Sequence, residues 1–327
     1  MVPHMNILIT GGAGFIGSNV ATYYLQKNHR VIIFDSLSKV EGGQNIASLK
    51  NNFGNQLTFV SQDIRNYDAV KDTVKDQDVV FHLAGHTISD TAITHPRYDF
   101  EVNGLGTLNI LESLRAVNRH AIVFYASSSK VYGNLTGDKK KSFCEAQALD
   151  FTSPIGCSIG AADQYVHDFS RSYGLKTVVF RLSTIYGEHQ WGWGEDDWIS
   201  YVLRLALQNK PITIYDEVFD PLYISDLLSA FDLSWKHIDT SAGQIFNIGG
   251  GTDHAVSKQH LILIIEKLLD KKLTTVLKPT KIGSQPYYVT NFNKAQKLLG
   301  WLPTTPLDQG LSQTLNWLKD HLEKNAV

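Results

Sequence analysis

Cysteine and long apolar runs are scarce in this chain of 327 residues. The two cysteines, Cys144 and Cys157, make neither a disulfide framework nor a zinc signature, and they suit a reducing compartment. No apolar run approaches the ~18 residues of a membrane span. Residues 1–5 are not a signal peptide, because the apolar stretch after them is a predicted strand. We therefore expect a cytoplasmic protein with no membrane partner.

A strong excess of one charge is also lacking. The chain has 30 Lys and Arg against 32 Asp and Glu, a formal net charge of −2. This balance gives no argument for nucleic acid or an anionic membrane, and we expect neither as a partner. The acids and histidines lack the spacing of metal ligands, so we expect no metal site. Hydrophobic content of 43% is ordinary for a soluble globular protein, and the length is sufficient for a large core.

The clearest motif lies near the N-terminus, where an apolar run at residues 7–9 predicts a buried strand. Glycines spaced G-x-x-G-x-x-G follow the strand, and a helical pattern then continues through Val20 and Tyr24. These glycines are Gly11, Gly14 and Gly17. Glycines let a phosphate approach the backbone, and the N-terminus of a helix favours an anion. The arrangement predicts a dinucleotide site, and the alternative is a glycine turn that only joins a strand to a helix.

An acidic residue strengthens this prediction. A second predicted strand, residues 31–35, ends in Asp35, about 20 residues after the glycines. An acid in this place can accept hydrogen bonds from a ribose diol, and its carboxylate would repel the 2′-phosphate of NADP. We therefore expect NAD as the cofactor. Lys39 weakens the preference over NADP slightly.

Predicted strands and helices alternate through the first half of the chain. Further strands are expected at residues 57–60, 78–83, 121–125 and 177–182, and long helices at residues 100–117 and 155–173. Strands separated by helices favour an α/β fold with a Rossmann-type, doubly wound parallel sheet. Ligands of such sheets bind beyond the carboxyl ends of the strands.

The second half is less regular. Helices are expected at residues 195–207, 225–235, 257–269 and 307–322, and short strands at residues 211–215 and 222–224. Ser225 is expected to cap the helix that it begins. We expect an NAD-binding Rossmann domain at residues 5–182, to which residues 216–248 return. A smaller mixed α/β C-terminal substrate lobe is expected from residues 183–215 and 249–327.

A family resemblance appears after the fifth predicted strand, at Ser127-Ser128-Ser129-Lys130-Val131-Tyr132-Gly133. This stretch resembles the extended short-chain dehydrogenase/reductase family, NAD-dependent epimerases and dehydratases that act mostly on nucleotide sugars. The likeness covers nearly the whole chain, and several stretches are similar to the CDP-tyvelose 2-epimerases, one group of this family. It implies a nucleotide-sugar substrate and a homodimer formed through the helices at residues 100–117 and 155–173.

The resemblance also implies where NAD is held. The expected contacts lie in the glycine turn, at the end of the second strand and after the third and fourth strands. Besides the three glycines, Asp35 and Lys39, they are Phe15, Ile16, Ser36, Asp63, Ile64, Leu83, Ala84, Gly85 and Asn103.

The chain departs from the family at its catalytic positions. In the family a serine or threonine hydrogen-bonds the reacting hydroxyl, and Ser128 has that place here. A tyrosine base follows at the start of the next long helix, with a lysine four residues later. Ile155 and Ile159 occupy these two positions, in a register fixed by Pro154 and Ser158. General acid–base catalysis is worth about 10²–10⁴-fold, so the site lacks its usual base. As the simpler interpretation, both isoleucines pack like any apolar residues of a helix face.

Two further departures concern the substrate. Relatives carry two arginines that contact the nucleotide diphosphate, and Phe219 and Pro286 occupy their places here. Charge-assisted contacts to phosphate are among the stronger ones in a site, so both losses count against a nucleotide sugar. Lys278 and Lys281 are nearby cations that could compensate.

Three polar residues on loops expected to face the nicotinamide are candidates for the missing base: His86, Lys130 and His189. The alternative for each is a solvated or hydrogen-bonded loop residue.

Candidate substrate contacts follow the sixth predicted strand: Ser183, Trp191, Trp193 and Trp198. The tryptophans either stack on a sugar or base or pack between the two lobes.

Three hypotheses remain open. The first is an NAD-dependent epimerase or dehydratase-like enzyme that acts on a nucleotide sugar or a related polyol. The second is a non-catalytic NAD-binding protein that senses the cofactor or forms a scaffold for a partner. The third is a changed reaction that keeps bound NAD but uses another base.

Overall fold

The structure, a computed structural model, describes residues 4–134, 141–279 and 284–324. Its centre is a parallel sheet with the strand order β11-β6-β5-β4-β1-β2-β3. The strands are β1 (Asn6–Thr10), β2 (Arg30–Asp35), β3 (Leu57–Ser61), β4 (Val79–His82), β5 (Ile122–Ser128), β6 (Lys176–Leu182) and β11 (Ile245–Ile248). The order runs outward in opposite directions from β1 and β4, which opens a crevice at their carboxyl ends. The predicted doubly wound sheet is therefore confirmed.

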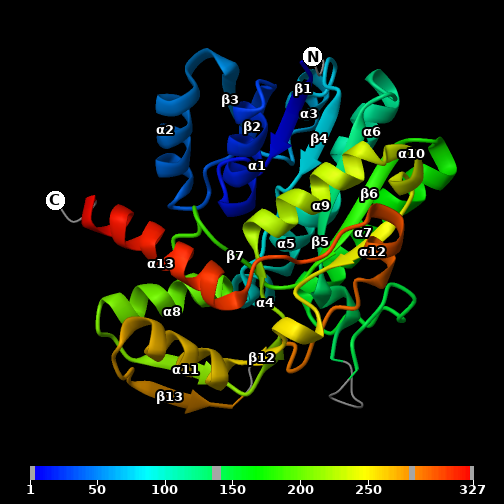
Figure 1. Ribbon diagram of the computed structural model, residues 1–327. Helices are drawn as coiled ribbons and strands as arrows, with labels where there is room; N and C mark the ends of the chain where they lie inside the picture. The colour runs from blue at the N-terminus through cyan, green and yellow to red at the C-terminus, as the bar shows by residue number, and fades with distance from the viewer. Residues whose placement is uncertain (1–3, 135–140, 280–283, 325–327) are drawn as a thin grey trace.

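Alternate residues of each strand serve opposite faces of the sheet. In β1, Ile7 and Ile9 join one buried cluster, while Leu8 joins the other. The first face is covered by α1 (Phe15–Gln26), α2 (Gly42–Phe53) and α9 (Ile224–Lys236). The second face is covered by α3 (Tyr67–Thr73), α6 (Gly106–Val117) and α7 (Pro154–Tyr173). Figure 1 shows the sheet between these two layers of helices.

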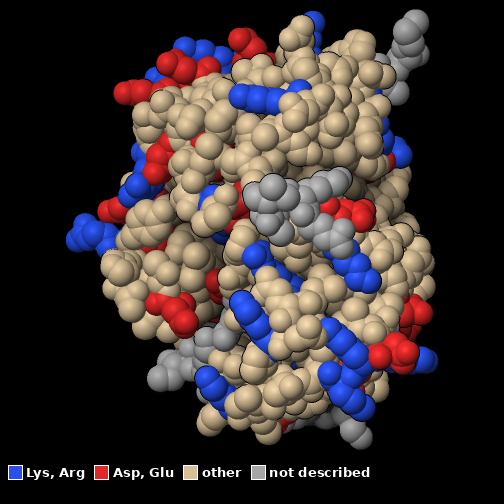
Figure 2. All heavy atoms as spheres, turned by 90° about the vertical axis from the view of Figure 1, so that its left-hand side faces the viewer, with Lys and Arg blue, Asp and Glu red and all other residues tan. Residues whose placement is uncertain are grey.

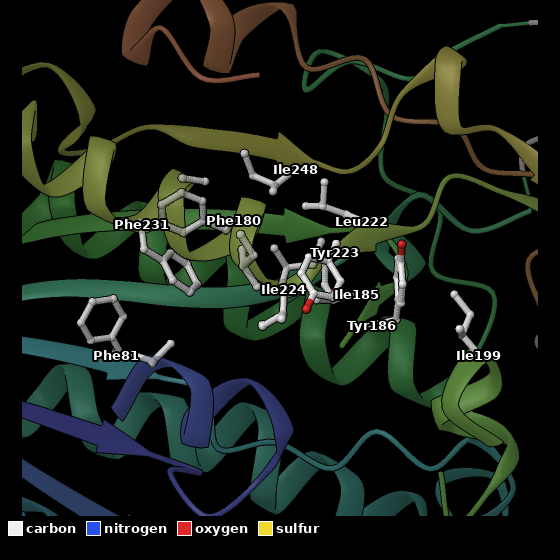
Figure 3. Close-up of a cluster of buried hydrophobic side chains, with 14 of the residues drawn as sticks. Phe81, Phe180, Ile185, Tyr186, Ile199, Leu222, Tyr223, Ile224, Phe231 and Ile248 are labelled. Carbon is white, nitrogen blue, oxygen red and sulfur yellow. The ribbon is translucent and has the colours of Figure 1, made fainter. Parts of the chain in front are cut away.

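Aromatic side chains fix α9 against the sheet. The Phe231 ring of α9 lies 4.9 Å from the Phe180 ring and 5.4 Å from the Phe81 ring, measured between centroids. All three side chains are fully buried, and Figure 3 shows them together with Ile248 of β11. Because offset aromatic contacts add to the free energy of burial, this cluster anchors α9 on the large sheet.

The connection between β4 and α6 is broken into short pieces. It contains α4 (Ser89–Thr94), α5 (Pro96–Phe100) and a π-helical turn over Glu101–Leu105 that leads directly into α6. The helix predicted at residues 100–117 therefore has a wider first turn. Because π-turns rotate the residues before them relative to an ideal helix, this turn changes the direction in which Asp99 is presented.

The smaller lobe is built from short elements. Its helices are α8 (Trp198–Leu207), α11 (Lys258–Leu269), α12 (Asn293–Leu299) and α13 (Leu307–Lys324), and α10 (Ile238–Ser241) follows α9. Outside the large sheet, the described strands pair in twos: β7 (Ile185–Tyr186) with β10 (Leu222–Tyr223), β9 (Val218–Phe219) with β12 (Val256–Ser257), and β8 (Ile212–Tyr215) with β13 (Thr275–Lys278). Figure 1 shows α8, α11 and β13 below the large sheet, with α13 crossing between the two parts.

One predicted helix cap is wrong. Helix α9 begins at Ile224, and Tyr223 rather than Ser225 occupies the N-cap position. The Ser225 hydroxyl instead pairs with the Thr305 hydroxyl at 3.2 Å. The buried carboxylate of Asp226 accepts hydrogen bonds from the Thr304 hydroxyl and the Thr305 main chain. Tertiary contacts to the C-terminal segment therefore replace the expected local cap.

Charges of both signs share the molecular surface. Figure 2 shows Lys and Arg side chains interspersed with Asp and Glu side chains on the face that carries the C-terminal end of the chain. Such a mixture gives this face no extended field of one sign. Among the described residues, every helix is too short or too polar to cross a membrane.

Candidate active site

A cleft with a volume of about 1020 Å³ lies at the carboxyl ends of the parallel strands. It runs from the glycine turn, past the end of β5 and the start of α7, to α8 and α11 of the smaller lobe. All fourteen predicted cofactor contacts line this cleft: Gly11, Gly14, Phe15, Ile16, Gly17, Asp35, Ser36, Lys39, Asp63, Ile64, Leu83, Ala84, Gly85 and Asn103.

The glycine turn is packed too tightly for a side chain at two of its glycines. Gly11 has a φ of +68°, and a Cβ placed there would lie 2.6 Å from the main-chain nitrogen of Ala84. A Cβ at Gly17 would lie 2.3 Å from the carbonyl oxygen of Gly11. Helix α1 begins just after Gly14 and has no acidic residue in its first turn, so the positive end of its dipole is not neutralised there. These features fit a dinucleotide pyrophosphate.

Asp35 lies beside the glycine turn. Its carboxylate accepts hydrogen bonds from the main-chain N–H groups of Ala13 at 3.0 Å and Leu37 at 2.8 Å. Burial raises the pKa of Asp35, and the two backbone donors oppose that change. The carboxylate is thus held at the edge of the glycine turn, where a ribose diol of the cofactor fits.

The two isoleucines form part of the cleft wall. Ile155 and Ile159 both line the cleft, and they pack with Val131, Tyr132 and Tyr288 in a buried apolar cluster. Both belong to the first turns of α7, which Ser153 caps by accepting a hydrogen bond from the N–H of Gly156. The wall that carries the acid–base pair in the resembled family is therefore apolar.

Ser128 and Lys130 lie at the end of β5. The Ser128 hydroxyl accepts a hydrogen bond from the main-chain N–H of Lys130 at 3.2 Å. The Lys130 ammonium donates to the Ser89 hydroxyl at 2.9 Å, and burial lowers the pKa of this lysine. Both residues line the cleft, so the structure brings these two candidates together.

His86 is held by buried polar groups. Its Nδ1 lies 2.8 Å from Oδ1 of Asp99, and its main-chain N–H donates to the Asn103 side chain at 2.7 Å. The other ring nitrogen, Nε2, is buried and has no hydrogen-bond partner among the described residues. His86 lines the same cleft as Ser128 and Lys130.

The prediction that His189 faces the cleft is wrong. Its ring packs 5.3 Å from the Trp317 ring of α13, in a separate cavity of about 440 Å³ that Glu188 and Tyr223 also line. Burial lowers the pKa of His189 to about 4. The loop after β7 turns this side chain toward α13, because the aromatic side chains of the C-terminal helix cover it.

Two of the predicted tryptophan contacts also lie away from the cleft lining. The Trp191 indole donates to the Asn45 side chain at 3.0 Å and packs edge-on against Trp317. Trp193 is half exposed, and the Arg204 guanidinium lies 3.4 Å from the centre of its ring. Trp191 therefore packs between α2 and α13.

Trp198 and Ser183 do line the cleft. The Trp198 ring packs edge-on against Phe219, and the Lys258 ammonium lies 4.7 Å from its centre. Ser183 donates to Oδ1 of the buried Asp220 at 2.5 Å. The cleft therefore has an aromatic wall at the end that the smaller lobe forms.

Phe219 and Pro286, which occupy the positions of the family's two arginines, carry no charge. One lysine near them was not predicted from the sequence. Lys258 is buried, lines the cleft and forms an ion pair with Glu217 at 2.7 Å. Lys278 is exposed on β13 outside the cleft lining, and Lys281 lies outside the described residues. No sequence signal indicated Lys258, because its place depends on the antiparallel pairing of β12 with β9.

Comparisons with known proteins place this geometry in a family. A model described as the NAD dependent epimerase/dehydratase family matches residues 7–249. CDP-paratose 2-epimerase of Salmonella typhi is 35% identical over 96% of this chain and 99% of its own length. dTDP-glucose 4,6-dehydratase of Salmonella typhimurium is 29% identical over 96% of this chain and 92% of its own length.

Solved structures agree with these relatives. UDP-glucuronic acid 4-epimerase from Bacillus cereus, in complex with UDP-glucuronic acid and NAD, has a TM-score of 0.88 and 26% identity, with 97% of this chain and 100% of that chain covered. UDP-glucose 4-epimerase of Thermotoga maritima, with UDP-glucose, has a TM-score of 0.85, 27% identity and the same coverage. The family expected from the sequence is confirmed, and this chain belongs to the NAD-dependent epimerase/dehydratase family.

Proposed function

We propose that this protein is an NAD-dependent enzyme of the epimerase or dehydratase type that acts on a nucleotide sugar with a base other than tyrosine. The observation that carries the proposal is the continuous cleft, which joins the glycine cradle to Ser128 and to the aromatic wall at Trp198. Related proteins of known structure bind UDP-glucose or UDP-glucuronic acid in the same fold.

The cofactor end is assigned from the geometry of the glycine turn. Gly11, Gly14 and Gly17 would hold the pyrophosphate of NAD, and Asp35 would hold its adenosine ribose. Bound NAD⁺ supplies an acceptor for a hydrogen that leaves a substrate C–H bond with its electron pair. Ser128 would hold the reacting hydroxyl by a hydrogen bond, and its place at the end of β5 supports this role.

The substrate end is assigned to the smaller lobe. We propose that residues 5–182 and 216–248 form the cofactor domain, and that residues 183–215 and 249–327 supply the substrate lobe. Trp198 lines this end of the cleft and supplies apolar surface for a sugar or a base. Lys258 offers a cation within the cleft, although its ion pair with Glu217 reduces the net charge that a diphosphate would meet.

A second function is favoured by one observation. Ile155 and Ile159 pack in a buried apolar cluster and leave this part of the cleft wall without an acid–base pair. A protein that binds NAD without turning over a substrate would have no need for the lost acid–base pair. The competing hypothesis is therefore a non-catalytic NAD-binding sensor or scaffold.

The test combines the purified protein and NAD with CDP-, UDP-, GDP- and dTDP-glucose. We expect NAD to bind and at least one nucleotide sugar to be consumed, as followed by chromatography and by transient NADH absorbance. Binding of NAD with neither binding nor consumption of any of the four sugars would support the sensor instead. A variant with Ile155→Tyr and Ile159→Lys gives a further comparison, since a gain of turnover there would identify a decayed family site.

A further inference from the structure

Asp99 is a fully buried carboxylate at the centre of a polar network whose hydrogen-bond directions can be assigned. The Asn103 side-chain oxygen accepts from the main-chain N–H of His86, so its amide nitrogen is the donor toward the His86 carbonyl oxygen, Ser158 and, at 3.3 Å, Asp99. The Ser158 hydroxyl accepts from Asn103 and therefore directs its own proton to Oδ2 of Asp99, at 2.5 Å. Because Asn103 and Ser158 are the donors in these contacts, the carboxylate of Asp99 acts as the acceptor.

This network favours one of the two ring nitrogens of His86 as the carrier of the proton. Because Oδ1 of Asp99 accepts, Nδ1 of His86 is the N–H donor at 2.8 Å. In the neutral imidazole the lone pair then lies on Nε2. That nitrogen is buried without a partner among the described residues, on a side chain that is only 9% exposed and lines the cleft. Buried acceptors normally receive a hydrogen bond, and Nε2 receives none from the described residues.

The network is attached to the same helix that lost the usual pair. Ser158 precedes Ile159 directly on α7, and Asp99 belongs to α5, which packs against α7. Asp99 therefore connects His86 to the apolar part of the cleft wall. Lys130 is held by Ser89 and is a donor while it is charged, and His189 lies outside the cleft. Of the three candidates, His86 is therefore the one that presents an acceptor atom, Nε2, before a substrate binds.

We propose that His86 is the proton-transfer residue of this site and that Asp99 is the positioning residue that fixes its tautomer. The proposal rests on the proposed function above. Nε2 takes the proton of a substrate hydroxyl while the hydrogen on the same carbon leaves with its electron pair for bound NAD⁺. The C–O bond becomes a carbonyl, NAD⁺ becomes NADH and the ring becomes an imidazolium. In the reverse direction the imidazolium returns the proton to the oxygen as hydrogen is returned to carbon.

The charges around His86 suit this role. Asp99 on α5 faces Nδ1 and would stabilise the imidazolium, and the Tyr98 ring packs edge-on against the histidine at 5.5 Å. Lys130, after β5, is close enough to Asp99 for an electrostatic interaction.

The first experiment measures turnover of the nucleotide sugar that the panel identifies, in His86→Gln and Asp99→Asn variants. We expect kcat to fall by about 10²–10⁴-fold in each, with the Kd for NAD within about threefold of the unchanged protein. Imidazole added to a His86→Gly variant should restore part of the activity, which a structural role would not do. His189→Gln changes a partly buried histidine outside the cleft; it is the matched control and should keep its turnover.

The second experiment needs no substrate. Long-range ¹H–¹⁵N NMR, with His86 identified by its absence in His86→Gln, should show the proton on Nδ1 in the unchanged protein and a change of tautomer in Asp99→Asn. A proton on Nε2 would overturn the proposal. So would full turnover in His86→Gln, or loss of turnover in Lys130→Met together with retention in His86→Gln. If no sugar of the panel is consumed, the proposed function fails, while the NMR result still decides the arrangement of His86 and Asp99.

Discussion

At the scale of single residues, Gly17 shows how little space the cofactor turn allows. Replacement by alanine would place a Cβ 2.3 Å from the Gly11 carbonyl oxygen and 2.6 Å from the Gly12 Cα. We expect Gly17→Ala to destabilise the fold by about 1–3 kcal/mol and to weaken NAD binding, because the turn must open. Denaturant unfolding and calorimetric titration measure the two effects.

Gly43 is the matched control for that substitution. It is an exposed glycine of helix α2, and a Cβ added there meets nothing within 4 Å. Gly43→Ala should therefore stabilise the protein by about 0.5–1 kcal/mol and leave NAD affinity unchanged. Equal effects of the two variants on NAD affinity would contradict the role given to the turn.

Asp220 predicts a pH dependence of stability. Burial raises the pKa of Asp220 to about 6. An aspartate in the unfolded chain titrates near 3.9, so between these values the folded protein holds the proton more tightly. The stabilisation from this group is complete below about pH 4 and is lost as pH rises through 6, a change of roughly 3 kcal/mol.

Asp220→Asn should remove this part of the pH dependence. The amide can accept from the N–H groups of Gly251 and Thr290 and donate to the Ser183 hydroxyl, as the protonated acid does. We expect the variant to be more stable than the unchanged protein at pH 7 and equally stable at pH 4, by denaturant unfolding at both values. Asp76→Asn, at an exposed position, is the control. An unchanged slope in Asp220→Asn would show that folding does not raise the pKa of Asp220.

The local structure around the glycine turn could be predicted because one short motif specifies it. The glycine spacing and Asp35 depend only on a strand, a turn and a helix that follow one another. Asp99 could not be predicted, because its contacts with His86 and Ser158 join three segments that are distant in the sequence. His189 was placed wrongly for a related reason: its orientation is set by α13, which lies more than a hundred residues later.

At the scale of elements, the N-terminal end of α7 sets the position of the cleft wall that contains Ile155. The Ser153 hydroxyl accepts from the N–H of Gly156 at 3.1 Å, and Pro154 follows in the first turn. Ser153→Ala should cost about 1 kcal/mol in the free energy of unfolding, since a free N–H is left at the helix end. It should also reduce turnover, because Ser158 and its bond to Asp99 lie just over one turn further along.

Ser153→Thr keeps the hydroxyl and is the control for that variant. It should retain nearly all the stability and turnover of the unchanged protein, as measured by denaturant unfolding and by the nucleotide-sugar assay. If the alanine variant loses stability but keeps its turnover, the start of α7 does not position the catalytic network.

Strands of the large sheet were easier to predict than the helices between them. Continuous apolar runs such as β4 and β5 are buried on both faces, and only their ends differ from prediction. Helices α2 and α3 were not predicted, because only a few of their residues are buried and their apolar patterns are weak. The π-helical turn before α6 has no periodic signal that could reveal it.

At the scale of the whole molecule, the two parts share one continuous core. Buried side chains of β1 and α1 belong to the same apolar cluster as those of α8, α11 and α13. The lobes are therefore held together by hydrophobic burial as well as by the polar cleft between them. A cleft walled by two parts with a common core is pre-organised, which suits a site that must exclude water from a proton-transfer pair.

We predict a homodimer, because of the family resemblance and because apolar side chains near α6 and α7 are exposed. Leu105 is 41% exposed and Tyr165 is 48% exposed, although both are large apolar residues on these elements. Pairing of α6 and α7 with those of a second copy would cover such side chains in a four-helix bundle.

Light scattering after gel filtration should give twice the chain mass of 36.5 kDa. Leu105→Glu with Tyr165→Glu should halve that value, because buried unpaired carboxylates oppose association. Leu277→Glu, on exposed β13, should leave it unchanged. A monomeric mass for the unchanged protein would refute the dimer and leave the active-site proposal intact, since both Ser128 and His86 line a cleft within one chain.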